Sequence, residues 1–194
     1  MKVLLKNKKE FPIDCVIFAG GKSSRMGEDK ALLSFGQKSL AKYQYDRLSQ
    51  IFEKVYICTK EPKFDFEAPL ILDSYEIFAP TPAFLDIFEQ ILEFFAISVD
   101  APFVDSSVTQ PLLETAAKYP HKDAIVARTD YPHPLIGIYR RSIAPLLAKE
   151  IQKGNYKLGA ILKKADTLFV DFKEDKRFLN LNTPADLEKA KNLL

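Results

Sequence analysis

Short apolar runs and longer amphipathic windows alternate along this chain. The runs have the length and content of buried strands, whereas the windows place apolar residues three and four positions apart, as in helices with one buried face. Strands are therefore predicted at 15–19, 55–58, 70–72, 95–99, 124–127, 135–139 and 167–172. Helices are predicted at 40–52, from Pro82 onward, at 107–118, 143–152 and 158–164, and after Thr183, which caps a last helix with Pro184 at its first position.

The order of these elements predicts the architecture. Strands that alternate with helices run parallel, because a right-handed crossover returns the chain to the same end of the sheet. We expect an α/β fold with one doubly wound, mostly parallel sheet and helices on both faces, in a single domain over residues 1–194. In such sheets ligands bind outside the carboxyl ends of the strands, so residues that directly follow a strand are candidates for a functional site.

Composition narrows the classes of function. The formal net charge of +2 is divided among 28 basic and 26 acidic residues, which does not favour a general polyanion binder, so nucleic acid is not an expected partner. No apolar run is long enough for a membrane span, and the first residues lack the apolar core of a signal peptide, which together predict a cytoplasmic protein. Cys15 and Cys58 lie in apolar strands, where buried reduced thiols are expected.

The segment from Gly20 to Lys30 has the chemistry of a phosphate site. It reads Gly-Gly-Lys-Ser-Ser-Arg-Met-Gly-Glu-Asp-Lys and begins where the first predicted strand ends. Paired glycines permit backbone conformations with positive φ, in which successive N–H groups point at one anion. Arg25 adds a planar fork for phosphate oxygens, and Lys30 adds a compact ammonium. The spacing matches neither G-x-x-x-x-G-K-[ST] nor G-x-G-x-x-G, so a glycine turn with solvated charges stays open as the alternative.

Two aspartates also follow predicted strands directly. Asp73 comes after 70–72, and Asp100 comes after 95–99. If these strands run parallel to the first, both carboxylates lie at the edge that holds the glycine segment. Carboxylates that face a triphosphate repel it unless a divalent cation lies between them, and Mg²⁺ prefers hard oxygen ligands of this kind. The alternative is that each aspartate only caps a turn.

These motifs together resemble one enzyme family. Phe18-Ala19-Gly20-Gly21-x-x-x-Arg25-Met26-Gly27-x-x-Lys30 is similar to the nucleotidyltransferase signature of the molybdenum cofactor guanylyltransferases. Asp100-Ala101-Pro102, His133-Pro134 and Asn180-Leu181-Asn182-Thr183-Pro184 resemble further segments of that family, in the same order. The resemblance covers nearly the whole chain and implies a Rossmann-like nucleotidyltransferase fold. In this family the A-G-G form at 19–21 accompanies GTP and an A-A-G form accompanies CTP, so the resemblance favours guanine.

The resemblance also implies a reaction. It implies transfer of GMP from Mg²⁺-bound GTP to the terminal phosphate of Mo-molybdopterin, with release of pyrophosphate and with Mg²⁺ as the cofactor. Residues 13–110 would form the nucleotide-binding half, and residues 111–194 the acceptor-binding half. Molybdenum-insertion proteins or apo-molybdoenzymes are the transient protein partners that such a function implies.

The residues expected at the site follow from the same resemblance. Contacts with GTP are expected from Phe18, Ala19, Gly20, Gly21, Arg25, Lys30, Asp73 and Asp100. Among these, Arg25, Lys30 and Asp100 are the expected catalytic residues, and Asp100 is the expected metal ligand. His133, Asn180 and Asn182 are expected on the acceptor side. The alternatives are that His133 is a solvated loop residue and that Asn182 only turns the chain into the last helix.

Two departures from the family pattern keep other functions open. Thr81-Pro82-Ala83-Phe84-Leu85 stands where the family has Gly-Pro-Leu-x-Gly, and Cys58 replaces an asparagine that contacts the nucleotide in the family. One alternative is another nucleotidyltransferase, namely a CTP-dependent molybdopterin cytidylyltransferase or a sugar-phosphate nucleotidyltransferase. Another is a weakened nucleotide-binding partner of molybdoenzymes. The last is an ordinary doubly wound domain such as a reductase, which the missing G-x-G-x-x-G does not favour.

Overall fold

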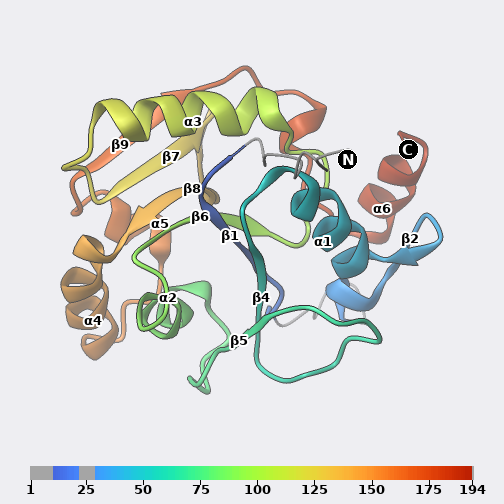
Figure 1. Cartoon of the computed structure of the whole chain (residues 1–194), viewed down its shortest axis with the longest axis horizontal. Coiled ribbons are helices and arrows are strands. Elements are labelled where there is room, and N and C mark those ends of the chain that lie inside the picture. Colours follow the sequence, from blue (N-terminus) through green and yellow to red (C-terminus); the bar gives the residue numbers. More distant parts are fainter. Residues whose placement is uncertain (1–10, 22–28, 194) are drawn as a thin grey trace, which may run out of the picture.

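A seven-stranded sheet forms the centre of the computed structural model, which describes residues 11–21 and 29–193. The strand order is β5-β4-β1-β6-β8-β7-β9 (Figure 1). Every apolar run predicted to be a strand forms one of these strands, and the prediction of a mostly parallel, doubly wound sheet is confirmed. The strands are β1 (Asp14–Phe18), β4 (Val55–Thr59), β5 (Leu70–Leu72), β6 (Glu93–Ser98), β7 (Ala124–Arg128), β8 (Pro132–Arg140) and β9 (Thr167–Asp171).

One strand of this sheet, β8, runs against the others. It pairs antiparallel with β6 on one side and with β7 on the other. Only residues 129–131 separate β7 from β8, and a connection of that length can join antiparallel strands but cannot cross over to a parallel one. The consequence for function is that the amino end of β8, with His133, lies at the edge where the parallel strands end.

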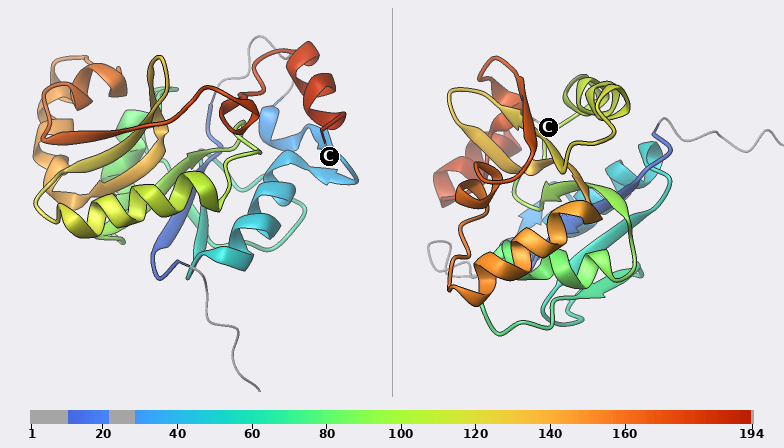
Figure 2. Two further views of the ribbon diagram at one scale, coloured as in Figure 1. Left: turned by 90° about the horizontal axis from the view of Figure 1, so that it is seen from above. Right: turned by 90° about the vertical axis from the view of Figure 1, so that its left-hand side faces the viewer.

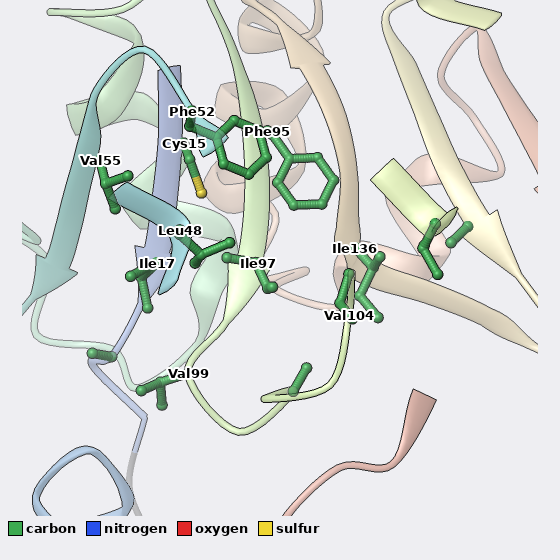
Figure 3. Close-up of a cluster of buried hydrophobic side chains, with 14 of the residues drawn as sticks. Cys15, Ile17, Leu48, Phe52, Val55, Phe95, Ile97, Val99, Val104 and Ile136 are labelled. Atoms are coloured by element: carbon green, nitrogen blue, oxygen red, sulfur yellow. The ribbon is translucent and has the colours of Figure 1, made fainter. Parts of the chain in front are cut away.

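Helices cover both faces of the sheet, as predicted (Figure 1). One face carries α1 (Leu40–Ile51), α3 (Ser106–Lys118) and α6 (Pro184–Lys191), and the other carries α2 (Pro80–Phe88), α4 (Ala144–Gln152) and α5 (Leu158–Leu162). Since successive strand residues point to opposite faces, β1 contributes Cys15 and Ile17 to the first core and Val16 and Phe18 to the second. Figure 3 shows the first core. Burial of each such side chain stabilises the fold by about 1.5–3 kcal/mol, which explains the continuous apolar runs.

Some local structure differs from the sequence prediction. A hairpin of β2 (Ser34–Phe35) and β3 (Lys38–Ser39) turns through Gly36, whose φ is 66°, and two-residue strands are too short to show a period. Helix α2 begins at Pro80 rather than Pro82. Thr183 caps α6 with Pro184 in its first turn, as expected. Helix α6 lies beside the β2–β3 hairpin (Figures 1 and 2), and Asn182, just before this helix, contacts Lys30.

The point where the sheet reverses its strand order fixes the position of the site. From β1 the chain moves outward to β4 and β5, and it then returns to β6 on the other side of β1. Phe18 is in register with Cys58 of β4 and with Ser98 of β6, so the three strands end level with one another. Ligands of doubly wound sheets bind in the crevice at this reversal.

No helix within residues 11–21 and 29–193 combines the length and the apolar content that a membrane crossing requires.

Candidate active site

A cavity lies at the carboxyl ends of β1, β4 and β6, and we call it the donor cavity. It has a volume of about 160 Å³. Arg25 lies outside the described residues, but all the other residues predicted to contact GTP line this cavity, together with Asp29, Cys58 and residues 78–80. The predicted residues that line it are Phe18, Ala19, Gly20, Gly21, Lys30, Asp73 and Asp100.

Lys30 joins three segments that lie far apart in the sequence. It opens the 3-10 helix η1 (Lys30–Leu32), for which Asp29 provides the cap by accepting a hydrogen bond from the Ala31 amide. The Lys30 Nζ lies 2.8 Å from Asp100 Oδ2 and 2.8 Å from Asn182 Oδ1. The Lys30 ammonium therefore joins Asp100, which is expected at the triphosphate, to Asn182, which is expected on the acceptor side.

Two of these residues, Asp100 and Asn182, offer oxygen atoms suited to Mg²⁺. A carboxylate oxygen and an amide oxygen converge on one positive charge, which here is the Lys30 ammonium. Hard oxygen ligands such as these bind Mg²⁺ in proteins, where one or two carboxylates act together with substrate phosphates and water. Among the described residues no cluster of three or more His, Cys, Asp or Glu side chains could hold a metal ion. The residues therefore fit a metal that arrives with phosphate ligands of its own.

Buried polar groups hold the turn that carries Asp100. Ser98 Oγ donates to Asp100 Oδ1 at 2.6 Å. From α1, the buried amide of Gln44 donates to the carbonyl oxygens of residues 98, 99 and 101 at 3.0–3.4 Å, and Arg47 in turn donates to Gln44 Oε1 at 2.6 Å. Gln44 is not among the site residues predicted from the sequence. The available signal was a polar residue on the buried stripe of α1, four positions from both Leu40 and Leu48.

The turn at Gly20 and Gly21 differs in two ways from the expected arrangement, in which glycines with positive φ point successive N–H groups at a phosphate. The Ala19 amide donates to the Cys58 carbonyl at 2.8 Å, so it belongs to the sheet and is not available to a phosphate. Neither Gly20 nor Gly21 has a positive φ, so the conformational argument for glycine does not apply there. A Cβ at Gly21 would meet no atom of the described residues within 4 Å, and one at Gly20 would make ordinary contacts at 3.7 Å. The described part of the fold would accept alanine at both positions.

Two lysines that the sequence analysis did not single out lie beside this cavity. Lys60 Nζ is 2.6 Å from Asp73 Oδ2, and the Tyr75 amide donates to Asp73 Oδ1, so Asp73 caps a turn and forms a buried ion pair. Lys63 Nζ donates to the Ala19 carbonyl at 3.0 Å and pairs with Asp29 at 2.5 Å. Both lysines follow β4 closely, and this position at the strand end was the signal that could have found them.

Cys58 faces the donor cavity as a neutral thiol. Burial raises the pKa of the Cys58 thiol to about 12, and the nearby carboxylates of Asp73 and Asp86 contribute to the rise. At neutral pH the side chain is therefore not a thiolate, and it has no nucleophilic role. As predicted, both Cys58 and Cys15 are buried free thiols.

A second cavity, which we call the acceptor-side cavity, has a volume of about 470 Å³. His133 and Asn180 line it, together with Tyr131, Tyr156 and Lys157. His133 belongs to β8 and is buried, with its ring 4.8 Å from the Phe178 ring and Nε2 2.8 Å from Thr129 Oγ1. The alternative of a solvated loop histidine is therefore wrong.

The electrostatics of His133 follow from this burial. Desolvation lowers the pKa of the His133 imidazole, and the attraction of Glu174 only partly opposes this. The ring is consequently neutral at pH 7, so it can offer a hydrogen bond but no positive charge to a ligand.

The two cavities adjoin at Asp100. Four residues line both of them, namely Pro80, Ser98, Asp100 and Leu135. Asn180 and Asn182 flank the buried Leu181, whose amide donates to the Asp100 carbonyl at 2.9 Å. The closing segment of the chain therefore contacts both cavities, Asn180 at the acceptor-side cavity and Asn182 at Lys30. An α/β sheet with a glycine turn, a carboxylate and two adjoining cavities at its carboxyl edge has the arrangement of a nucleotidyltransferase.

Comparison with known proteins agrees with this class. Residues 15–168 match the family model of the MobA-like NTP transferase domain, and the chain belongs to that family. It is a nucleotidyltransferase, which excludes a reductase. A molybdenum cofactor guanylyltransferase from Campylobacter jejuni (strain RM1221) is 38% identical over 190 residues, which are 94% of this chain and 97% of the relative.

More distant relatives support the same assignment. A molybdenum cofactor guanylyltransferase from Helicobacter pylori (strain ATCC 700392 / 26695) is 32% identical over 207 residues, covering 98% of this chain and 97% of the relative. Among solved structures, molybdopterin-guanine dinucleotide biosynthesis protein A from Archaeoglobus fulgidus superposes with a TM-score of 0.82 over 93% of this chain and 98% of the other. Its sequence identity is 23%, so this likeness shows the shared fold.

Proposed function

We propose that this protein transfers GMP from Mg²⁺-bound GTP to the terminal phosphate of Mo-molybdopterin, with release of pyrophosphate. The observation that carries the proposal is the pair of cavities that meet at Asp100, because a transferase must hold a donor and an acceptor on the two sides of one reacting phosphate. The names of the relatives support guanylyl transfer and the molybdenum cofactor as acceptor.

In this proposal one half of the chain binds the nucleotide and the other half binds the acceptor. Apart from Leu135, every residue that lines the donor cavity belongs to 13–110, the proposed nucleotide-binding half. Most of the residues that line the acceptor-side cavity belong to 111–194, the proposed acceptor-binding half. Phosphoryl transfer between them needs an in-line arrangement, and a rigid sheet edge provides it at low cost in entropy.

The catalytic task is positioning and charge neutralisation. The acceptor phosphate is already an anionic nucleophile, so no general base is needed, and the neutral thiol of Cys58 leaves no covalent route through that residue. Lys30 and Arg25 contribute positive charge to the phosphates as pyrophosphate leaves. Asp100 and Asn182 would hold Mg²⁺, which would supply positive charge to neutralise the phosphates. Lys30 would exchange its carboxylate partner for phosphate oxygens when the nucleotide binds.

The glycines of the turn give independent support for a ligand at this place. Since residues 11–21 and 29–193 would accept a methyl group at Gly20 and at Gly21, packing within this part of the chain does not explain the glycines. Backbone that must approach a ligand closely does explain them. The amides of Gly20 and Gly21 are the proposed phosphate donors, while Ala19 and Phe18 contribute the cavity wall.

Thermal unfolding with each nucleotide tests the donor assignment. With Mg²⁺ present, GTP at one hundred times its Kd should stabilise the protein by about 2.7 kcal/mol, which for a chain of this size raises Tm by about 5–10 °C. CTP, ATP and UTP at equal concentration should have little effect. A larger shift with CTP would favour a cytidylyltransferase and contradict the proposal.

Product formation tests the reaction itself. Pyrophosphate release should require GTP, Mg²⁺ and Mo-molybdopterin together. If the protein binds GTP selectively but releases no pyrophosphate with the acceptor present, it is a nucleotide-binding partner of molybdoenzymes rather than the transferase proposed here.

A further inference from the structure

The Lys60 side chain contacts three residues of the connection between β5 and α2. This connection, residues 73–79, joins β5 to α2 and contains no helix or strand. The Lys60 ammonium lies 2.6 Å from Asp73 Oδ2 and donates to the carbonyl oxygens of Tyr75 and Ile77, the latter at 2.9 Å. An ammonium has three donors, so this one connection takes all of them.

The same connection forms one wall of the donor cavity. Asp73, Phe78 and Ala79 line the cavity from it. The Phe78 ring is exposed at the cavity, with the Lys60 ammonium 5.6 Å from its centre. An aromatic face at this place suits the stacking of a nucleobase, which is a planar group with a π-face of its own.

On its other side, Lys60 contacts the glycine turn. A Cβ built at Gly20 would lie 3.7 Å from Lys60 Cγ and 3.7 Å from the Lys60 amide nitrogen. The lysine stem therefore lies between Gly20 and the 73–79 connection, and its head group fixes the distance between the two walls of the cavity.

This ion pair differs from an ordinary surface pair. The side chains of Lys60 and Asp73 are 19% and 5% exposed. Loss of one partner from a buried pair leaves the other charge desolvated and uncompensated, whereas exposed pairs contribute little. Removal of the lysine would also leave two carbonyl groups of the connection without the donor that they now share.

We propose that Lys60 is a positioning residue for the donor nucleotide. It holds the 73–79 connection, with Asp73 and Phe78, against the glycine turn, so that the wall for the base and ribose is in place before a purine nucleoside triphosphate binds. The identity of that nucleotide rests on the proposed function. Lys60 acts through Asp73 and Phe78 and not on the reacting phosphate.

Steady-state kinetics of three variants test this role. Lys60→Met keeps the stem and removes the charge, and it should raise the KM for GTP about tenfold or more, the cost of losing hydrogen bonds to a charged group. The value of kcat should stay within about twofold, because the transition-state contacts are unchanged. Lys60→Arg should restore most of the affinity. The matched control is Lys122→Met, which breaks an ion pair to Asp166 outside both cavities and removes a lysine that is 22% exposed. A KM in Lys60→Met equal to that of the control would overturn the proposal.

Hydrogen exchange gives a second readout that does not depend on which nucleotide binds. Amides in 73–79 should exchange faster in Lys60→Met than in the wild type, and Lys122→Met should leave them unchanged. If exchange in 73–79 does not change, the positioning role is wrong whatever the donor nucleotide is. If exchange does change but the wild type shows no preference for GTP, the positioning role stands and the proposed function fails.

Discussion

Replacement of Gln44 by leucine would test how the fold holds Asp100 in place. Gln44 is fully buried on α1, and its amide nitrogen donates to the carbonyl oxygens of residues 98, 99 and 101. Its amide oxygen accepts a hydrogen bond from Arg47. Leucine has a similar volume but offers neither donor nor acceptor, so packing is largely preserved while this network is lost.

The expected magnitude follows from the groups left without partners. The amide has two N–H donors, so at least two carbonyl interactions and one hydrogen bond from a guanidinium disappear. Each buried polar group left unsatisfied costs about 1–3 kcal/mol, and a total of about 3 kcal/mol is expected. For a protein of this size that loss corresponds to a decrease in Tm of about 6–12 °C. Turnover should also fall at temperatures where the variant is folded, because the turn that carries Asp100 relaxes.

Urea unfolding and thermal unfolding measure this change, and Gln110→Leu is the matched control. Gln110 lies exposed on α3, where its amide donates a hydrogen bond to Glu114 one turn further on, so its loss should cost less than about 0.5 kcal/mol. If Gln44→Leu is no less stable than Gln110→Leu, the network does not support the Asp100 turn and the reasoning is refuted.

Three further substitutions have defined outcomes. Lys30→Ala should reduce GMP transfer by about a hundredfold or more while the circular dichroism spectrum stays native, and a folded variant with near-normal transfer would contradict the role of Lys30. Asp100→Asn should raise the Mg²⁺ concentration needed for half-maximal turnover, and an unchanged Mg²⁺ titration would exclude Asp100 as the ligand. Hydrogen bonds from Lys164 and Asn155 lower the pKa of Glu150 to about 2 from 4.5, so its stabilisation is complete above pH 4.5 and is lost as the pH falls toward 2. Glu150→Gln should therefore lower Tm at pH 7 and make the wild-type and variant values converge near pH 2, whereas a constant difference would contradict this account.

The strands and helices of the sheet could be predicted from the sequence because the spacing of hydrophobic residues reflects which side chains are buried. The runs that became β1, β4 and β6 are buried on both faces, and that burial produces the signal. Periodicity does not report direction, so β8 was recognised as a strand but its antiparallel course was not. His133 lay outside the predicted strand at 135–139, so a solvated loop position stayed open as an alternative, although the residue lies in β8.

The candidate site was predicted where residues follow strands directly. Asp73 and Asp100 line the donor cavity, and Lys30 reaches Asp100 across 70 residues of sequence. Lys60, Lys63 and Gln44 were missed because their roles depend on partners supplied by the fold. A lysine beyond a strand looks like a solvated side chain until Asp73 or Asp29 is placed beside it. The position of a residue in the sequence can mark it as a candidate, but the partner that it meets is set by tertiary structure.

A crystal structure of the protein with Mg²⁺ and a non-hydrolysable GTP analogue would show where the donor and the metal bind. We expect the triphosphate at the amides of Gly20 and Gly21, with Mg²⁺ on Asp100 and with Lys30 Nζ moved from the carboxylate to a phosphate oxygen. A nucleotide bound instead in the acceptor-side cavity beside His133, or a metal held away from Asp100, would contradict it.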